Sequence, residues 1–194
     1  KKALDFFRKA LAIQPENNDF LRATIQVHEA REDWEDVVHY RRRLIELVED
    51  EGERFQLLIS VGETLVEGLS NFRSAAESYQ DALQLQPESK LVLGRLYELH
   101  QYDENWEGAI DALTQLAQLE SEGPRKAKYW CGVASIQQKF MDDRFTAVRS
   151  FDRALDADPT LLEAFEAIDH ILTQDRDYER QDRYYRKMLK RAAD

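Results

Sequence analysis

Apolar residues recur along this chain at the three- and four-residue intervals that place side chains on one face of a helix. One set is Leu58, Val61, Gly62 and Leu65, at offsets of three, four and seven. Four further segments have the same spacing: Leu21, Thr24, Ile25 and His28; Leu93, Leu96, Tyr97 and His100; Trp130, Val133, Ala134 and Gln137; Phe165, Ile168, Asp169 and Leu172. Short polar stretches, such as residues 31–33, 103–105 and 175–177, separate these segments from further helical patterns. The pattern predicts helices that are paired through short turns.

A second pattern returns at a constant interval and sets the length of the repeat. An alanine is followed by an aromatic residue four positions later, by an alanine three positions after that, and by a proline five positions further on. It occurs three times with equal spacing: Ala3, Phe7, Ala10 and Pro15; Ala75, Tyr79, Ala82 and Pro87; Ala147, Phe151, Ala154 and Pro159. Trp34, Trp106 and Tyr178 recur at the same interval. The interval contains two units of about 36 residues each, and alternate units resemble each other more than neighbours do. We call this interval, which separates Pro15 from Pro87, a double repeat.

This spacing resembles the tetratricopeptide repeat, whose two helices carry W-x2-L-G-x2-Y and then A-x3-F followed by P. The residues that match best are Leu58, Val61, Gly62, Ala75, Tyr79, Ala82 and Pro87. The resemblance covers nearly the whole chain and implies an all-α solenoid of antiparallel helix pairs with about 11 helices. It implies a lone second helix in residues 1–17, followed by repeats at about 18–53, 54–89, 90–124, 125–161 and 162–194, in a single domain of residues 1–194.

Some repeats depart from the family pattern. Val37, Arg41 and Leu44 stand where small, aromatic and small residues are usual, and Tyr97 and Asp169 each replace a small residue. Two longer connections are expected at residues 49–53 and 120–124, as longer turns in preference to partner contacts.

The two ends of the chain also depart from a complete repeat array. Because the chain opens with a second helix and closes without a polar capping helix, we expect a fragment of a longer repeat protein or ends covered by another chain. The apolar residues expected at such end contacts are Leu4, Phe7, Leu11, Tyr185, Met188 and Leu189.

Composition and charge narrow the class of protein. With 7 Gly and 4 Pro in 194 residues, the chain lacks the turn residues that all-β sandwiches and barrels need. The formal net charge of -11 opposes binding to nucleic acid and favours basic or neutral partners. No apolar stretch is long enough to span a bilayer, and a single cysteine allows no internal disulfide. These features fit a cytoplasmic protein, with a periplasmic one still open, and the excess of Arg over Lys points weakly to a bacterial source.

In tetratricopeptide proteins the inner face of the first helices is generally the peptide groove, and the resemblance implies the same here. The acidic residues of this face outnumber the basic ones, so we expect it to favour a basic or neutral peptide. Ile59, Val66 and Leu91 could hold an anchoring apolar side chain. The predicted groove residues are Arg22, Gln26, Glu29, Gln56, Ile59, Glu63, Val66, Leu91, Arg95, Glu98, Gln101, Lys128, Cys131, Ser135, Gln138, Glu163, Glu166, His170 and Thr173. The alternative, that these are ordinary solvated helix faces and that binding takes place elsewhere, stays open.

One subtype of the family is disfavoured. Its chaperone-binding members hold the terminal carboxylate of a peptide with a clamp of Lys, Asn and Arg. Here Arg22 and Gln26 stand at the first Lys and Asn, Ser60 at a second Asn and Leu91 at a second Lys, so only Arg95 matches. Because a carboxylate clamp needs converging cations, recognition of chaperone tails is not expected.

No motif for catalysis or metal binding emerges. The glycines are isolated, no G-x-S-x-G elbow occurs, and no two histidines are spaced as ligands on one helical turn. Cys131 is interpreted as a packing residue, since no base is visible near it. We therefore predict no enzymatic activity, no catalytic residue, no metal and no cofactor.

The favoured function is a scaffold or adaptor that binds a protein or peptide in the groove. Two alternatives remain: an assembly element that oligomerises through its ends, and a regulatory domain of a larger protein. RNA processing through helical repeats is disfavoured by the net charge.

Overall fold

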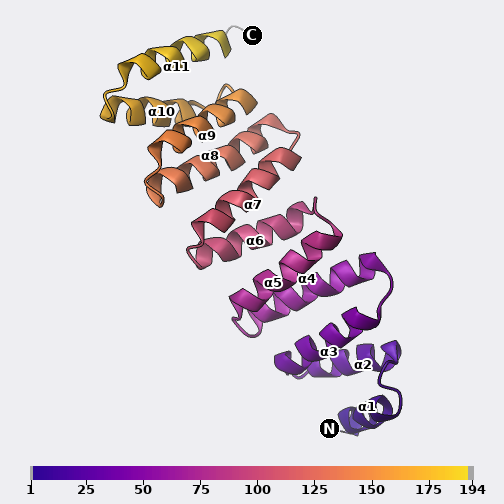
Figure 1. Cartoon of the computed structure of the whole chain (residues 1–194). Helices are drawn as coiled ribbons and strands as arrows, with labels where there is room; N and C mark the ends of the chain where they lie inside the picture. The colour runs from indigo at the N-terminus through magenta and orange to yellow at the C-terminus, as the bar shows by residue number, and fades with distance from the viewer. Residues whose placement is uncertain (1, 192–194) are drawn as a thin grey trace. The chain divides into compact units, whose positions relative to one another are not determined.

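The structure is a computed structural model that describes residues 2–191, so Lys1 and residues 192–194 of the predicted segments lie outside the described residues. Within that range the chain forms eleven helices and no strand (Figure 1). None of these helices is long and apolar enough to cross a membrane. Their bounds are α1 Lys2–Ile13, α2 Asn18–Glu29, α3 Trp34–Leu47, α4 Glu51–Glu67, α5 Phe72–Leu85, α6 Lys90–Tyr102, α7 Trp106–Leu119, α8 Gly123–Lys139, α9 Arg144–Ala157, α10 Leu162–Gln174 and α11 Tyr178–Arg191.

The helices fall into two compact units. Unit 1 is Lys1–Val92, with α1 to α5, and unit 2 is Leu93–Asp194, with α7 to α11; the division falls within α6. In unit 1 each helix packs against the next one along the chain, from α1 to α5. In unit 2 the same succession runs from α7 to α11. Each unit is therefore built by chain neighbours that cover one another, as in repeat proteins.

The repeat that matches the family pattern best, residues 54–89, packs as that pattern predicts. The Tyr79 ring of α5 is almost fully buried and lies against Gly62 of α4, where an added Cβ atom would come within 2.5 Å of the ring. Ala75 and Ala82 flank Tyr79 and are also buried. In unit 2, the equivalent alanines and Phe151 of α9 are buried in the same way. The small residues of the pattern are needed because two helices approach closely around one large ring.

The turns inside the five helix pairs share one backbone conformation. One residue in each turn has a positive φ, between 49° and 58°, and none of them is glycine: Glu32, Ser70, Glu104, Asp142 and Arg176. The next residue in each turn precedes the second helix, and four of these side chains cap it by accepting a bond from a backbone N–H: Asn71, Asn105, Asp143 and Asp177. The positive-φ residues of alternate turns are separated by one double repeat, so the backbone confirms the period found in the sequence.

The connections expected at residues 49–53 and 120–124 are shorter than predicted. α4 begins at Glu51 and α8 at Gly123, and each has 17 residues, against 12 or 13 for α2, α6 and α10. The additional residues extend the helices instead of the connections. Since Glu51 and Gly123 are separated by one double repeat, the extension belongs to the regular alternation of the repeats.

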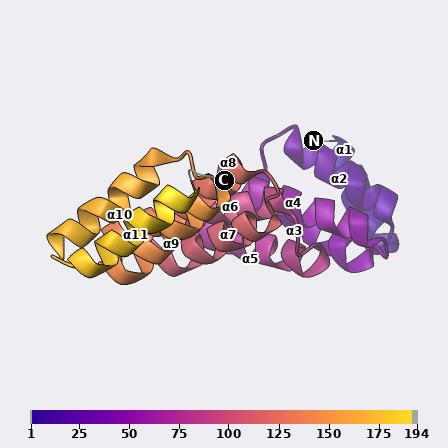
Figure 2. The ribbon, with the colours of Figure 1, turned by 90° about the horizontal axis from the view of Figure 1, so that it is seen from above.

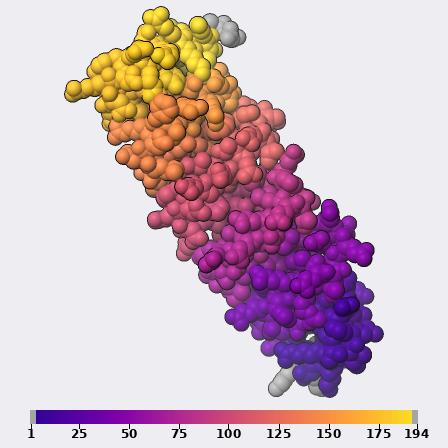
Figure 3. Space-filling view, in the orientation of Figure 1, coloured from indigo at the N-terminus to yellow at the C-terminus, as the bar shows by residue number. Residues whose placement is uncertain are grey.

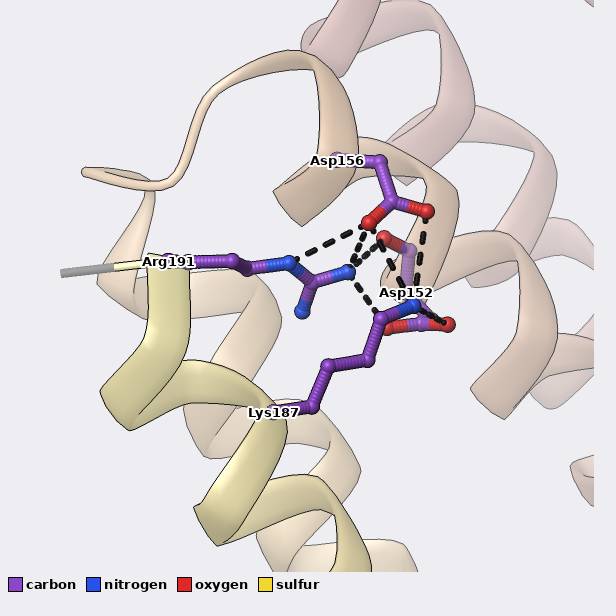
Figure 4. Close-up of polar contacts among 4 residues, drawn as sticks. All are labelled: Asp152, Asp156, Lys187 and Arg191. Carbon is purple, nitrogen blue, oxygen red and sulfur yellow. Dashed lines mark hydrogen bonds and ion pairs between the residues drawn. The ribbon is translucent and has the colours of Figure 1, made fainter. Parts of the chain in front are cut away.

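The helix α11 lies beside α9 (Figure 2), and polar contacts hold the two helices together (Figure 4). None of the described residues of α11 is buried, although it lies in the position of a second helix. Lys187 Nζ donates to Asp152 Oδ2 at 2.6 Å, and Arg191 Nη2 donates to Asp152 Oδ1 at 2.6 Å and to the Asp152 carbonyl oxygen at 3.0 Å. Both cations also pair with Asp156. Because the Arg191 side chain is only 9% exposed, these charge-assisted bonds are partly shielded from solvent.

A second polar group joins α10 to α11. Asp169 Oδ1 accepts hydrogen bonds from Gln181 Nε2 at 2.6 Å and from the Tyr185 hydroxyl at 2.7 Å. These two bonds lower the pKa of Asp169, and the bond to Asp169 raises the pKa of Tyr185. Asp169 is one of the two residues that replace a small one in the repeat pattern, and its two partners lie on the side of α11 that faces it. In the space-filling view, α11 forms the outer surface at the C-terminal end of unit 2 (Figure 3).

Glycine is expected to stabilise the chain at a positive-φ turn position. Replacing Glu104 by Gly should raise the free energy of unfolding by about 0.5–1 kcal/mol, because the left-handed conformation is strained for a residue with a Cβ atom. Gln115→Gly, at an exposed position inside α7, is the matched control and should lower it by about 1 kcal/mol. Urea unfolding followed by circular dichroism measures both. Equal destabilisation by the two variants would contradict the strain at residue 104.

The bonds to Asp169 should make the stability of unit 2 depend on pH. A free Asp titrates near pH 3.9, and the folded pKa of Asp169 lies lower, so its contribution is complete above that range and is lost as the pH falls through the folded value. Asp169→Asn should be less stable than the parent by a few tenths of a kcal/mol above pH 5, since the carboxylate is close to solvent. The difference should shrink below about pH 4. Urea unfolding of both proteins between pH 3 and pH 6 tests this, and a difference that does not change with pH would refute it.

Candidate partner-binding surfaces

The predicted groove residues of α2 and α4 lie on adjoining faces of unit 1. Arg22 of α2 forms an ion pair with Glu53 at the start of α4. Glu29 of α2 accepts a bond from Arg41 of α3. The same Arg41 guanidinium donates to the Ser60 carbonyl oxygen at 3.0 Å and to the Thr64 hydroxyl in α4. The charges of Arg22 and Glu29 are therefore balanced within the chain, and they are less available to a partner than the sequence suggested.

The prediction that Ile59 anchors a ligand is wrong. Its side chain is 5% exposed and belongs to the core. α4 packs against both α3 and α5, so its buried face is wider than that of a helix with one neighbour. Among the other predicted residues of this unit, Gln26, Gln56 and Leu91 are exposed, and Glu63 and Val66 are half-buried.

The predicted groove residues of unit 2, which we call the unit 2 face, are polar and mostly exposed. The exposed ones are Glu98, Gln101, Lys128, Glu163, Glu166, His170 and Thr173. Arg95, Cys131, Ser135 and Gln138 are half-buried. Arg95 Nη1 pairs with Glu98 Oε2 on the same helix at 3.3 Å. The carboxylates of this face outnumber its cations, as expected from the sequence.

Cys131 is the thiol on this face. Burial, and to a smaller extent the charge of Glu163 on α10, raise the pKa of Cys131 to about 11. At neutral pH the side chain is therefore a thiol, whereas the nucleophilic form is the thiolate. The environment of Cys131 accordingly supports the interpretation as a packing residue.

Two of the predicted end contacts are corrected by the structure. Leu4 and Leu11 are buried, because the face of α1 that carries them packs against α2. Phe7 is half-buried, and Phe6 and Ile13 are the large apolar residues that are exposed among the described side chains of this helix. They line a hollow of about 410 Å³ with Ala10 and Phe20. On α11, Tyr185 and Leu189 are exposed and Met188 is half-buried.

A buried histidine lies beside two carboxylates at the turn after α2. His28 Nδ1 is 3.2 Å from Asp33 Oδ2 and 3.3 Å from Asp36 Oδ2, and the His28 ring stacks on Tyr40. The three side chains could offer one nitrogen and two oxygens to a cation. His28 Nε2, however, is buried without a partner among the described residues. A metal on Nδ1 would place a hydrogen on Nε2 with no acceptor, so the geometry suits a bond donated by Nδ1 better.

The same turn in unit 2 supports a structural role for this histidine. His100, one double repeat after His28, lies 3.2 Å from Asn105, the counterpart of Asp33. The counterpart of Asp36 is Gly108, which offers no carboxylate. Unit 2 therefore keeps the histidine, although an amide stands in place of the first carboxylate and a glycine in place of the second.

A cationic surface on α11 was missed by the sequence prediction. A hollow of about 440 Å³ is lined by Asp152, Arg180, Arg183, Tyr184, Arg186, Lys187 and Lys190. α11 contains six cationic residues and two carboxylates, although the chain carries a net charge of -11. The signal was present in the sequence, and counting charge per predicted helix instead of over the whole chain would have found it. Several of these cations are paired within α11, including Arg183 with Glu179 and Arg186 with Asp182.

Solved structures with the same arrangement of helices define the class of fold. The chain matches a MamA protein with a TM-score of 0.52 and 14% sequence identity, over 90% of this chain and 91% of that chain. It matches YrrB, described as a TPR protein with an unusual peptide-binding site, with a TM-score of 0.50 and 17% identity, over 86% and 81%. It matches the C-terminal part of a TPR repeat-containing protein from Cytophaga hutchinsonii with a TM-score of 0.53 and 15% identity, over 99% and 74%.

No protein-family model and no curated protein sequence matches the chain. The structural matches have identities at which the fold alone is shared. The chain therefore has the tetratricopeptide-repeat fold, as the spacing of its residues predicted.

Arg41 is expected to contribute more to stability than its neighbour Arg42. Arg41→Met should lower the free energy of unfolding by about 1–3 kcal/mol, because it removes three hydrogen bonds and leaves Glu29 without its cation. Arg42→Met, at an exposed position of the same helix, should change it by less than about 0.5 kcal/mol. Urea unfolding provides the measurement. Equal effects of the two substitutions would show that the contacts of Arg41 add nothing to the fold.

Proposed function

We propose that this chain is a non-enzymatic scaffold or adaptor that binds a peptide or a segment of a partner protein on the faces of its first helices. The observation that carries the proposal is the exposed, acidic face in unit 2. Glu98, Glu163 and Glu166 are exposed there against the cations Lys128 and Arg95, and Arg95 pairs with Glu98, so Glu163 and Glu166 remain in excess. Such a surface attracts a basic segment and tolerates a neutral one.

The fold supports binding to a partner because a repeat scaffold presents a preformed surface. Little ordering is required of the receptor when its helices are already packed, so more of the interaction energy remains as affinity. YrrB, which shares the fold, is described as having a peptide-binding site. We extend peptide binding to this chain as part of the proposal, together with a cytoplasmic location.

Self-association is the second candidate, and one observation favours it. Phe6 and Ile13 are 62% and 81% exposed beside an apolar hollow on α1. Apolar side chains in such positions lose unfavourable contact with water when a second surface covers them. An increase of the weight-average mass with concentration in analytical ultracentrifugation, abolished by Phe6→Ser and Ile13→Ser, would favour this candidate over peptide binding.

Charge reversal on the unit 2 face should weaken binding of basic peptides. Peptides are selected from a random dodecapeptide library displayed on phage, with the wild-type chain as bait, and their affinities are measured by fluorescence anisotropy. The triple variant E98K/E163K/E166K should bind one group of the Lys- and Arg-containing peptides at least tenfold more weakly, about 1.4 kcal/mol, because it replaces attraction by repulsion at their binding surface.

The matched control changes the net charge equally at exposed positions of unit 1. E67K/E77K/E88K should leave the affinity within about twofold of the wild type if the unit 2 face is the binding surface. Circular dichroism establishes that both variants keep their helices. If both triple variants lose affinity equally, the loss results from the change in net charge alone, and the assignment of peptide binding to the unit 2 face is wrong.

A further inference from the structure

Large apolar side chains gather where the turns of unit 2 join first helices to second helices. Phe140 and Phe145 are 55% and 58% exposed, and Tyr178 is 64% exposed. Tyr102 and Met141 are also exposed. We call these five residues the turn-edge surface. They belong to the ends or starts of α6, α9 and α11 and to the α8–α9 turn, and none of them was among the predicted groove residues.

Side-chain contacts join these residues across three successive helix pairs. The Phe140 ring stacks on Trp106 of α7, with ring centroids 3.8 Å apart. The Arg180 guanidinium of α11 lies over the Phe145 ring at 4.9 Å. Arg144 Nη1 and Asp175 Oδ1 are 3.0 Å apart and connect the adjoining turns. The α8–α9 turn is therefore in contact with the start of α7 on one side and with the α10–α11 turn and the start of α11 on the other.

Unit 1 forms the same turns with other side chains at four of these five positions. One double repeat earlier, the chain has Ala30, Gly68, Leu69 and Arg73 in place of Tyr102, Phe140, Met141 and Phe145. The backbone is equivalent, since Ser70 and Asp142 have φ values of 49° and 51°. Trp34, the counterpart of Trp106, packs directly over Gly68. The fold therefore does not require the rings of Tyr102, Phe140 and Phe145, and apolar area exposed in excess of what folding needs is typical of interaction sites. Tyr178 differs from them, since it stands at the repeat position of Trp34 and Trp106.

The charge around the turn-edge surface is negative. Residues 102–107, 139–145 and 175–180 contain eight carboxylates and four cations. Asp103, Glu104 and Glu107 are exposed beside Tyr102 and Trp106. A cation of a partner would be attracted both by these carboxylates and by the faces of the exposed rings, as Arg180 already is by Phe145.

We propose that the turn-edge surface is a second docking site, for a segment of another protein that carries apolar side chains flanked by Lys or Arg. The rings cover the apolar side chains, and the acidic rim pairs with the flanking cations. An anionic membrane or a nucleic acid would be repelled by the same rim. The site lies outside the faces of the first helices, so it goes beyond the proposed function and neither depends on it nor replaces it.

The residues of unit 1 provide a substitution that the fold already tolerates. The variant F140G/M141L/F145R carries at these three positions what unit 1 has one double repeat earlier. The probe is the set of peptides selected from the random dodecapeptide library on the wild-type chain. We expect a group of peptides with at least two apolar residues and flanking Lys or Arg to bind this variant at least tenfold more weakly. E98K/E163K/E166K should bind that group within twofold of the wild type.

The two proposals fail in different ways in this experiment. If every selected peptide binds F140G/M141L/F145R as well as the wild type, the turn-edge site is refuted, whereas the proposed function is judged by E98K/E163K/E166K alone. Selected peptides that depend on the turn-edge residues but lack Lys and Arg would also refute the stated partner. Dimerisation of the wild type that is lost in the variant would reassign the surface to a second copy and overturn the proposal. The single variant F145R is the control for misfolding. It should keep the circular dichroism of the wild type, so that weaker peptide binding by it cannot result from loss of the fold.

Discussion

Within each unit, the packing of every helix against its chain neighbours is the constraint on which this structure depends, because a single helix pair cannot bury its apolar face alone. α4 shows the consequence most clearly. It is covered on one side by α3 and on the other by α5, and its buried residues include Phe55, Leu58 and Ile59. The close approach of Tyr79 to Gly62 and the left-handed turn residues both serve this stacking, because each sets the distance or direction at which the neighbouring helix arrives.

The chain meets this constraint in more than one chemical way. Where most second helices bury Ala, Leu or aromatic side chains, α3 uses Arg41 to bond α2 and α4, and α11 uses Lys187 and Arg191 to bond α9. Polar packing of this kind is directional, so it specifies one arrangement of the helices, but its net gain is smaller than the strength of each bond suggests. It also makes the association of α11 with its neighbours sensitive to salt and to pH, unlike an apolar contact.

Residues that lie one double repeat apart can be compared, and the comparison distinguishes positions that the fold requires from positions that a binding surface can use. Positions that are alike in both units, such as His28 and His100, serve packing and turn formation. Positions that differ on the same backbone, such as Gly68 and Phe140, are free to take up another role. The acidic residues of the unit 2 face and most of the turn-edge surface lie on such variable positions, which leaves them free for the two docking roles proposed above.

The order and pairing of the helices, their buried alanines and the repeat length were determined by the sequence, because residue spacing sets which side chains share a helix face. The sequence did not show how many neighbours cover each face. For that reason Ile59 was expected in a groove and lies in the core, Leu4 and Leu11 were expected at open contacts and are covered by α2, and Phe140 and Phe145 were not singled out. Exposure and long-range ion pairs depend on which helix packs beside which, and that was decided only by the tertiary structure.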